Sequence, residues 1–167
     1  MMKFDILVVG GGHAGIEAAS AGARMGCSVG LVTMDRFALG RMSCNPAIGG
    51  TAKGHLVREI DALGGIMGLI SDKTGIQFRM LNKSKGPAVW SPRCQSDRRL
   101  YSEEAYHIIS LTKNLEIVEE SAVEVLAESG KIIGIKTQNG EEIHCKALIL
   151  SSGTFLNGLM HTGLNKT

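Results

Sequence analysis

The chain begins with an apolar run, Phe4–Val9, that leads directly into the glycine-rich stretch Gly10–Gly15. An apolar run of this length bounded by glycines is typical of a buried strand. One helical face, formed by Gly15, Ala18, Ala19, Gly22, Met25 and Gly26, then consists almost entirely of small side chains. A helix with such a face can lie close against a sheet, and Gly26 is a natural end for it. A second apolar run, Ser28–Thr33, completes the pattern of a βαβ unit with a parallel sheet.

The middle of the chain is predicted to contain more loops and two helices. Residues 34–51 are rich in Gly, Pro, Asn and Ser and predict a long connection. A helix is predicted from about Ala52 to Leu63, with Leu56, Ile60 and Leu63 on one face. Residues 71–99 predict another loop-rich stretch. A second helix, from about Asp97 to Thr112, is expected to bury Tyr101, Ala105, Ile108 and Ile109.

The final third predicts strands. The short strand-like runs are Leu115–Glu119, Ala122–Glu128, Lys131–Gln138 and Glu142–Lys146, with a hairpin signal at Asn139-Gly140. Ala147–Gly153 then predicts a buried parallel strand ending in a glycine turn. A meander that returns to a parallel strand is the order seen in two-dinucleotide flavoproteins. We therefore predict an α/β, Rossmann-like FAD-binding domain over residues 1–167, and the patternless end, 158–167, suggests part of a longer protein.

Composition is that of a globular domain. The chain has 167 residues, 44% of them hydrophobic, a mean hydropathy of +0.10 and a net charge of +2. Its four cysteines form no Cys-x-x-Cys pair and no zinc-ligand spacing. The first residues do not resemble a signal peptide, and no apolar run reaches the roughly 18 residues of a membrane span. These features predict a reduced, cytoplasmic protein that does not enter a membrane.

The glycine-rich stretch predicts a dinucleotide site. In a Gly-x-Gly-x-x-Gly turn the first glycine permits a tight turn, the second lets the backbone approach a pyrophosphate, and the third lets helix and strand pack closely. Gly10, Gly12 and Gly15 occupy these positions. The helix that follows offers unpaired amides and its positive dipole end to phosphates. A purely structural glycine turn is the alternative.

Thr33 stands where the fingerprint usually has an acidic residue that binds the adenosine ribose. A threonine hydroxyl can also bond a ribose, although it carries no charge. The alternative is that Thr33 is only a strand residue. The departure argues against an ordinary NAD dehydrogenase.

Cys44 is the strongest candidate for covalent chemistry. It lies in Ser43-Cys44-Asn45-Pro46, in a loop that should lie over the carboxyl ends of the strands, where ligands bind in doubly wound sheets. Lys53 and His55 follow closely and could favour a thiolate. The alternative is a small apolar residue that fills a turn. Disulfide reductases would need a second cysteine nearby, so that chemistry is disfavoured.

Residues 82–99 are basic and punctuated by proline and glycine. Such a stretch could contact phosphates, or it could be an ordinary solvated loop.

Taken together these motifs resemble the N-terminal part of the GidA (MnmG) family of tRNA-modifying flavoproteins. The matching residues are Gly10–Gly15, Cys44–Gly50, Lys53–Leu56, Glu59–Gly65, Gly75–Arg79, Ser84–Val89, Arg93, Gln95, Asp97, Arg98 and Gly153–Leu156. The glycine turn is generic, whereas Cys-Asn-Pro-Ala-Ile-Gly-Gly is highly specific. Thr33 also matches this family.

The resemblance implies FAD as the tightly bound cofactor, NADH as the reductant and methylenetetrahydrofolate as the one-carbon donor. It implies a homodimer that works with an MnmE-type GTPase in a heterotetramer. Together they add an aminomethyl or carboxymethylaminomethyl group to C5 of the wobble uridine of tRNA. Family members are several times longer than this chain, so by itself the chain is expected to bind FAD poorly and to lack full activity.

The resemblance also assigns residues. It gives Cys44 a catalytic role and places Val123 near the adenine. Residues 82–99 become candidates for contact with tRNA or folate. The residues it assigns to FAD are Gly10, Gly11, Gly12, His13, Ala14, Gly15, Thr33, Val123, Gly153 and Thr154. Two other classes stay open: a generic FAD oxidoreductase of a small substrate, and a non-catalytic nucleotide- or RNA-binding module.

Overall fold

The computed structural model describes residues 2–43, 45–154 and 161–166. Its larger sheet has six strands in the order β6-β2-β1-β9-β8-β7. These strands are β1 (Met2–Val9), β2 (Val29–Thr33), β6 (Leu115–Glu119), β7 (Ala122–Glu128), β8 (Lys131–Thr137) and β9 (Glu142–Leu150). β6, β2, β1 and β9 run parallel, and β7, β8 and β9 form an antiparallel meander. The predicted Rossmann-like sheet with an inserted meander is therefore confirmed.

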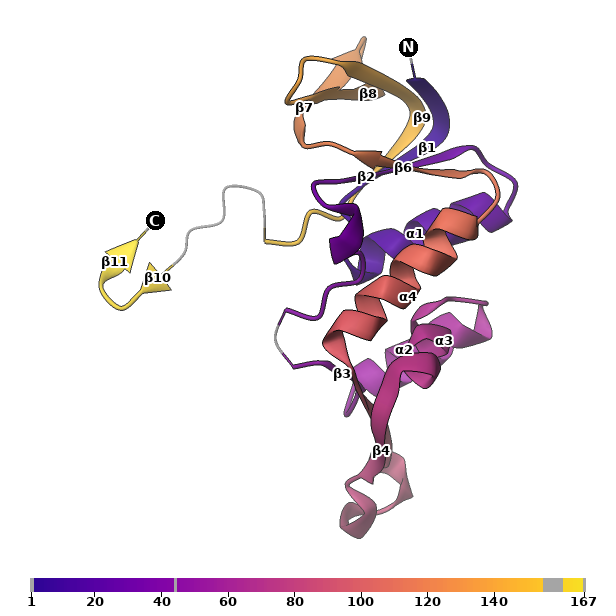
Figure 1. Cartoon of the computed structure of the whole chain (residues 1–167), viewed down its shortest axis with the longest axis vertical. Coiled ribbons are helices and arrows are strands. Elements are labelled where there is room, and N and C mark those ends of the chain that lie inside the picture. The colour runs from indigo at the N-terminus through magenta and orange to yellow at the C-terminus, as the bar shows by residue number, and fades with distance from the viewer. Residues whose placement is uncertain (1, 44, 155–160, 167) are drawn as a thin grey trace.

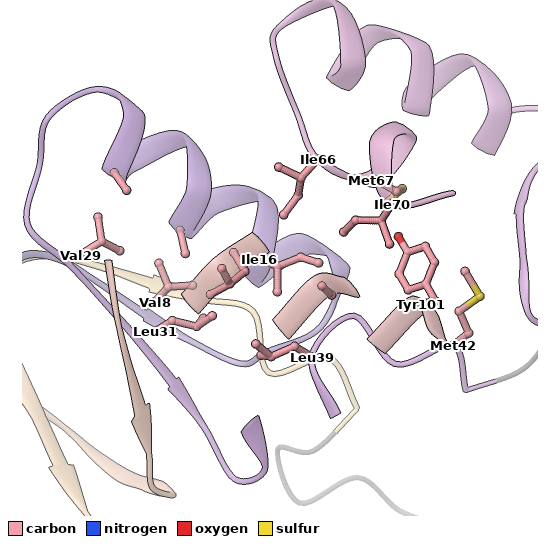
Figure 2. Packing of buried hydrophobic residues seen from close by; sticks show 14 of the residues in the cluster. Val8, Ile16, Val29, Leu31, Leu39, Met42, Ile66, Met67, Ile70 and Tyr101 are labelled. Atoms are coloured by element: carbon pink, nitrogen blue, oxygen red, sulfur yellow. The ribbon is translucent and has the colours of Figure 1, made fainter. Parts of the chain in front are cut away.

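Two helices pack on one face of this sheet (Figure 1). They are α1 (His13–Arg24) and α4 (Arg98–Leu111), close to the bounds that the sequence predicts. Their buried side chains join those of the parallel strands in one cluster, and Figure 2 shows Ile16 of α1 between Val8, Leu31 and Leu39 on one side and Tyr101 on the other. Small residues on α1 let it lie close: a Cβ at Gly22 would lie 3.1 Å from the Ile6 side chain.

The opposite face of the sheet is covered by the meander. Phe4, Leu7 and Val32 of the parallel strands pack there with Ile135 and Ile143. Both faces of β2 are thus buried, which explains its continuous apolar sequence.

A second, three-stranded antiparallel sheet lies at the far end of the molecule (Figure 1). Its order is β3-β5-β4, with β3 (Ala47–Gly49), β4 (Gly75–Leu81) and β5 (Ser91–Ser96). Short 3-10 helices at Lys83–Lys85 and Pro87–Val89 connect β4 to β5, and another lies at Arg36–Ala38. The prediction that residues 34–51 and 71–99 are loops was therefore wrong in part. β4 exposes four successive side chains, so it lacks the alternation of apolar and polar residues that indicates a strand.

Helix α3 (Met67–Thr74) was not predicted at all. It has no side-chain cap of its own, and its first amides are bound from another helix. The Glu17 carboxylate of α1 accepts hydrogen bonds from the backbone N–H of Ile66, at 3.0 and 3.1 Å, and of Met67, at 2.6 Å. A cap supplied from 50 residues away leaves no local sequence signal.

The predicted helix from about Ala52 to Leu63 is confirmed as α2 (Lys53–Ala62), and its apolar face is open, since Leu56 is 57% and Leu63 83% exposed. Two further expectations are corrected. The predicted runs Glu142–Lys146 and Ala147–Gly153 form one strand, β9, which pairs first with β8 and then along β1. The sequence pattern predicts no helix or strand in residues 158–167, yet a small hairpin of β10 (His161–Thr162) and β11 (Asn165–Lys166) lies within this segment.

Candidate dinucleotide site at the first strand–helix turn

The turn after β1 requires a glycine at its first position. Gly10 has a φ of +112°, a conformation that side chains disfavour, and a Cβ there would lie 2.4 Å from the carbonyl oxygen of Ser151. The Gly10 amide donates to the Val32 carbonyl at 2.9 Å, which ties the turn to β2.

Gly15 packs the start of α1 against that turn. A Cβ at Gly15 would lie only 1.7 Å from the Gly10 carbonyl oxygen. Gly11 is enclosed as well, since a Cβ added there would lie 2.6 Å from the Leu39 side chain and 2.7 Å from the Thr33 hydroxyl oxygen. The predicted tight turn and close helix packing are both present.

Gly12 differs from its neighbours because a Cβ there would meet nothing within 4 Å. It is exposed and is the N-cap of α1, with no side-chain cap, and the first helical hydrogen bond runs from Ile16 to Gly12 at 3.0 Å. The amides before Ile16 have no acceptor within the helix. The open space beside Gly12 and the positive end of the helix dipole fit the pyrophosphate of a dinucleotide such as FAD.

Ser151 was missed by the sequence reasoning, yet it holds this turn in place. Its hydroxyl donates towards the carbonyls of Val9, at 3.0 Å, and Gly10, at 3.1 Å, and its amide donates to Val9 at 2.8 Å. A serine at the end of β9, two residues before Gly153, was the available signal.

Thr33 lies at the carboxyl end of β2, beside Gly11, and is 9% exposed. Its hydroxyl donates to the carbonyl of Asp35 at 3.2 Å and keeps its lone pairs for a hydrogen bond from a ligand. The carboxylate of Asp35 accepts from the Phe37 amide at 2.8 Å.

His13, the first residue of α1, is held neutral. Its ring lies 5.5 Å from that of Tyr101, and its Nε2 atom is buried without a hydrogen-bond partner in the described part of the chain. Burial lowers the pKa of His13 to about 4, and the positive charge of Lys53 contributes in the same direction. Burial also raises the pKa of the Tyr101 hydroxyl.

The remaining predicted site residues are less enclosed. Ala14, Gly153 and Thr154 are exposed, and Gly153 has a φ of +60°. Val123 is 61% exposed in β7, which starts just after the hydrogen bond from Glu120 N–H to the Thr33 carbonyl. That bond brings the start of β7 to the same sheet end as Thr33.

Cys44 lies outside the described residues. Of the two residues expected to assist it, Lys53 donates to the Ala47 carbonyl at 3.2 Å and so ties α2 to the strand that follows the Cys44 loop. His55 is exposed. The other cysteines, Cys27, Cys94 and Cys145, are free thiols.

Among the described residues, no cluster of His, Cys, Asp or Glu has the makings of a metal site. In the same part of the chain, no helix combines the length and apolar character needed to span a membrane.

Comparison with known proteins identifies relatives of nearly the whole chain. The family model "Glucose inhibited division protein A" matches residues 5–167. The chain is 55% identical over 161 residues to the tRNA uridine 5-carboxymethylaminomethyl modification enzyme MnmG of Phocaeicola vulgatus, and 53% identical over 162 residues to that of Protochlamydia amoebophila. The matches cover 96% and 97% of this chain but only 26% of the length of each relative.

A solved structure agrees. GidA of Aquifex aeolicus superimposes with a TM-score of 0.94 at 48% identity, covering 99% of this chain and 28% of that one. The P. aeruginosa protein PqsL, described as a probable FAD-dependent monooxygenase, matches with a TM-score of 0.59 at 15% identity and shares the fold alone. With its turn, sheet order and family match in agreement, the chain belongs to the GidA family, glucose inhibited division protein A.

Proposed function

We propose that residues 1–167 are the FAD-binding part of an enzyme that modifies C5 of the wobble uridine of tRNA with an aminomethyl or carboxymethylaminomethyl group. The observation that carries the proposal is the 55% identity, over 96% of the chain, to an enzyme named for carboxymethylaminomethyl modification of tRNA uridine. The chain spans about a quarter of that relative, so further parts of the enzyme would lie in other segments.

The first turn supports FAD binding. The open N-terminus of α1 at Gly12, His13 and Ala14 would hold the pyrophosphate, and the Thr33 hydroxyl would accept a hydrogen bond from the ribose. Gly10, Gly11 and Gly15 would shape this cradle from behind. Val123 would lie near the adenine, and Gly153 and Thr154 would close over the dinucleotide.

Cys44 is proposed as the nucleophile. C5 of uracil becomes reactive when a thiolate adds reversibly at C6, so a cysteine near the flavin can prepare the base for one-carbon transfer. FAD, when bound, supplies the redox chemistry on the one-carbon unit that no side chain can perform. NADH would be the reductant and methylenetetrahydrofolate the one-carbon donor.

The proposed assembly is a cytoplasmic homodimer that works with an MnmE-type GTPase. The tRNA named for the relatives supports tRNA as the substrate, and the homodimer and the GTPase are what the resemblance to the GidA family implies.

Two measurements test the proposal. A chimaera in which residues 1–167 replace the matching quarter of the Phocaeicola vulgatus enzyme, mixed with FAD and passed over a desalting column, should retain an absorbance band at about 450 nm. The same chimaera should form the modified uridine, as read by mass spectrometry of digested tRNA. Cys44→Ser should abolish that product, while Cys27→Ser, the matched control, should not.

The outcomes separate the alternatives. A chimaera that retains no flavin contradicts both flavoenzyme proposals and leaves a nucleotide- or RNA-binding module. Retained flavin with an active Cys44→Ser chimaera leaves an FAD oxidoreductase in which Cys44 is structural.

A further inference from the structure

A pocket of about 360 Å³ lies between the three-stranded sheet and helices α2 and α3. Three arginines line it: Arg58 of α2, Arg79 of β4 and Arg93 of β5. Most of the remaining surface is apolar, with Phe78 among its side chains. Strand β3, which begins three residues after Cys44, also borders the pocket through Ile48 and Gly49.

The strand register sets two of these arginines against each other. Arg79 pairs directly with Arg93 across β4 and β5, and Arg93 pairs with Gly49 across β5 and β3. Like charges at directly opposed positions destabilise a sheet. The fold therefore carries a repulsion here that a bound anion would relieve.

Among the described residues, acidic side chains do not balance the charge of these three arginines. In the part of the chain that the structure describes, none of the ion pairs involves Arg58, Arg79 or Arg93. Arg93 donates from Nη2 to the neutral amide oxygen of Gln95 at 3.4 Å. Asp72 is the one carboxylate among the described residues that line the pocket.

The positive charge continues beyond the pocket along the hairpin of β4 and β5. Residues 73–96 contain five Lys or Arg residues and no Asp or Glu. Lys83 and Lys85 are exposed at its tip, and the rings of Phe78 and Trp90 are 60% and 44% exposed. Cations interleaved with exposed aromatic rings are the features with which proteins bind single-stranded nucleic acid.

We propose that the pocket of Arg58, Arg79 and Arg93 binds a backbone phosphate of the RNA substrate, and that the β4–β5 hairpin follows the same strand. Guanidinium groups match the geometry of phosphate oxygens. A small anion would need only the pocket. The positive charge continues from the pocket to Lys83, Lys85 and the Trp90 ring at the hairpin tip, and a polynucleotide is long enough to contact both. The proposal rests on the proposed function for the choice of tRNA as the RNA.

Binding of this chain to an unmodified tRNA transcript, followed by fluorescence anisotropy over a range of salt, tests the site. Arg79→Gln, Arg93→Gln and Arg58→Gln should each weaken binding by about fivefold or more and lower the slope of log K against log salt by about 1. Arg24→Gln, an exposed arginine of α1 that does not line the pocket, makes the same charge change and should have less effect. Arg79→Lys keeps the charge without the fork and should restore part of the affinity.

The melting temperature of each variant distinguishes a loss of RNA binding from a loss of folding. Since Arg79→Gln removes the repulsion with Arg93, its melting temperature should equal or exceed that of the wild type while its RNA affinity falls. Unchanged affinity in the three glutamine variants, or an equal loss in Arg24→Gln, overturns the proposal. Inorganic pyrophosphate is titrated against the same variants. If the glutamine variants lose pyrophosphate binding but keep full affinity for the tRNA transcript, the proposal is overturned in favour of a small anion.

Flavin retention by the same variants, measured in the chimaera, keeps the two proposals apart. If flavin is retained and the RNA affinity does not depend on Arg58, Arg79 or Arg93, only the proposal of the RNA-binding pocket is contradicted. Arginine-dependent RNA binding without retained flavin contradicts the flavoenzyme and leaves the pocket.

Discussion

Gly12 and Gly15 lie in the same turn but face different surroundings. A Cβ at Gly15 would lie 1.7 Å from a backbone oxygen, whereas one at Gly12 would enter open space. Gly15→Ala should therefore destabilise the fold by about 3 kcal/mol, because backbone atoms would have to move. Gly12→Ala should change the free energy of unfolding by less than about 1 kcal/mol and still lower FAD affinity by about tenfold or more.

Urea unfolding and titration with FAD measure the two effects separately. Equal loss of stability in both variants would contradict the difference in packing. Full FAD affinity in a folded Gly12→Ala would contradict the placement of the pyrophosphate.

His13 makes stability depend on pH in a defined window. Burial lowers the pKa of His13 to about 4 in the folded chain, whereas an unfolded histidine titrates near 6.5. As pH falls from about 6.5 to 4, the unfolded state takes up a proton that the folded state does not. The folded state should lose up to about 3 kcal/mol over this window.

Urea unfolding at several pH values tests this. His13→Gln should have a smaller change in the free energy of unfolding between pH 7 and pH 4 than the wild type. The exposed His107 provides the control, and His107→Gln should keep the full dependence. An unchanged dependence in His13→Gln would show that this ring is not the cause.

Between elements, the Glu17 carboxylate joins two helices, since it caps α3 from the body of α1. Glu17→Ala should cost about 2 kcal/mol, because the amides of Ile66 and Met67 lose their acceptor. Glu17→Gln keeps one oxygen and should cost less. Glu103→Ala, which removes an exposed partner of Arg99, should change stability by less than about 1 kcal/mol in the same urea experiment. A Glu17→Ala chain as stable as Glu103→Ala would contradict the capping role.

The elements that the sequence predicted are those whose pattern is local. β1, β2 and α1 follow from continuous apolar runs and from a face of small residues, and their bounds match within a few residues. α3 and β4 could not be predicted in this way. α3 depends on a distant carboxylate, and β4 is a strand because β5 pairs with it although its own side chains do not alternate.

At the scale of the whole molecule, the glycine turn and the arginine pocket differ in how far the sequence predicts them. The glycine turn is readable from the motif itself. The arginine pocket is not, because Arg58, Arg79 and Arg93 come from three elements and meet only when β4 pairs with β5 and α2 packs beside them. The basic character of residues 82–99 was visible in the sequence, but the pairing of Arg79 with Arg93 was not.

The sequence alone determined the βαβ start, the glycines that shape its turn, and the resemblance to the GidA family, because these depend on residues close together along the chain. Tertiary structure decided which side chains complete the sites. Ser151, which follows β9 directly, holds the Gly10 turn from 141 residues further along the chain, and Arg79 faces Arg93 through strand register. Both contacts depend on pairing between segments that are distant along the chain, and the local sequence pattern does not predict that pairing.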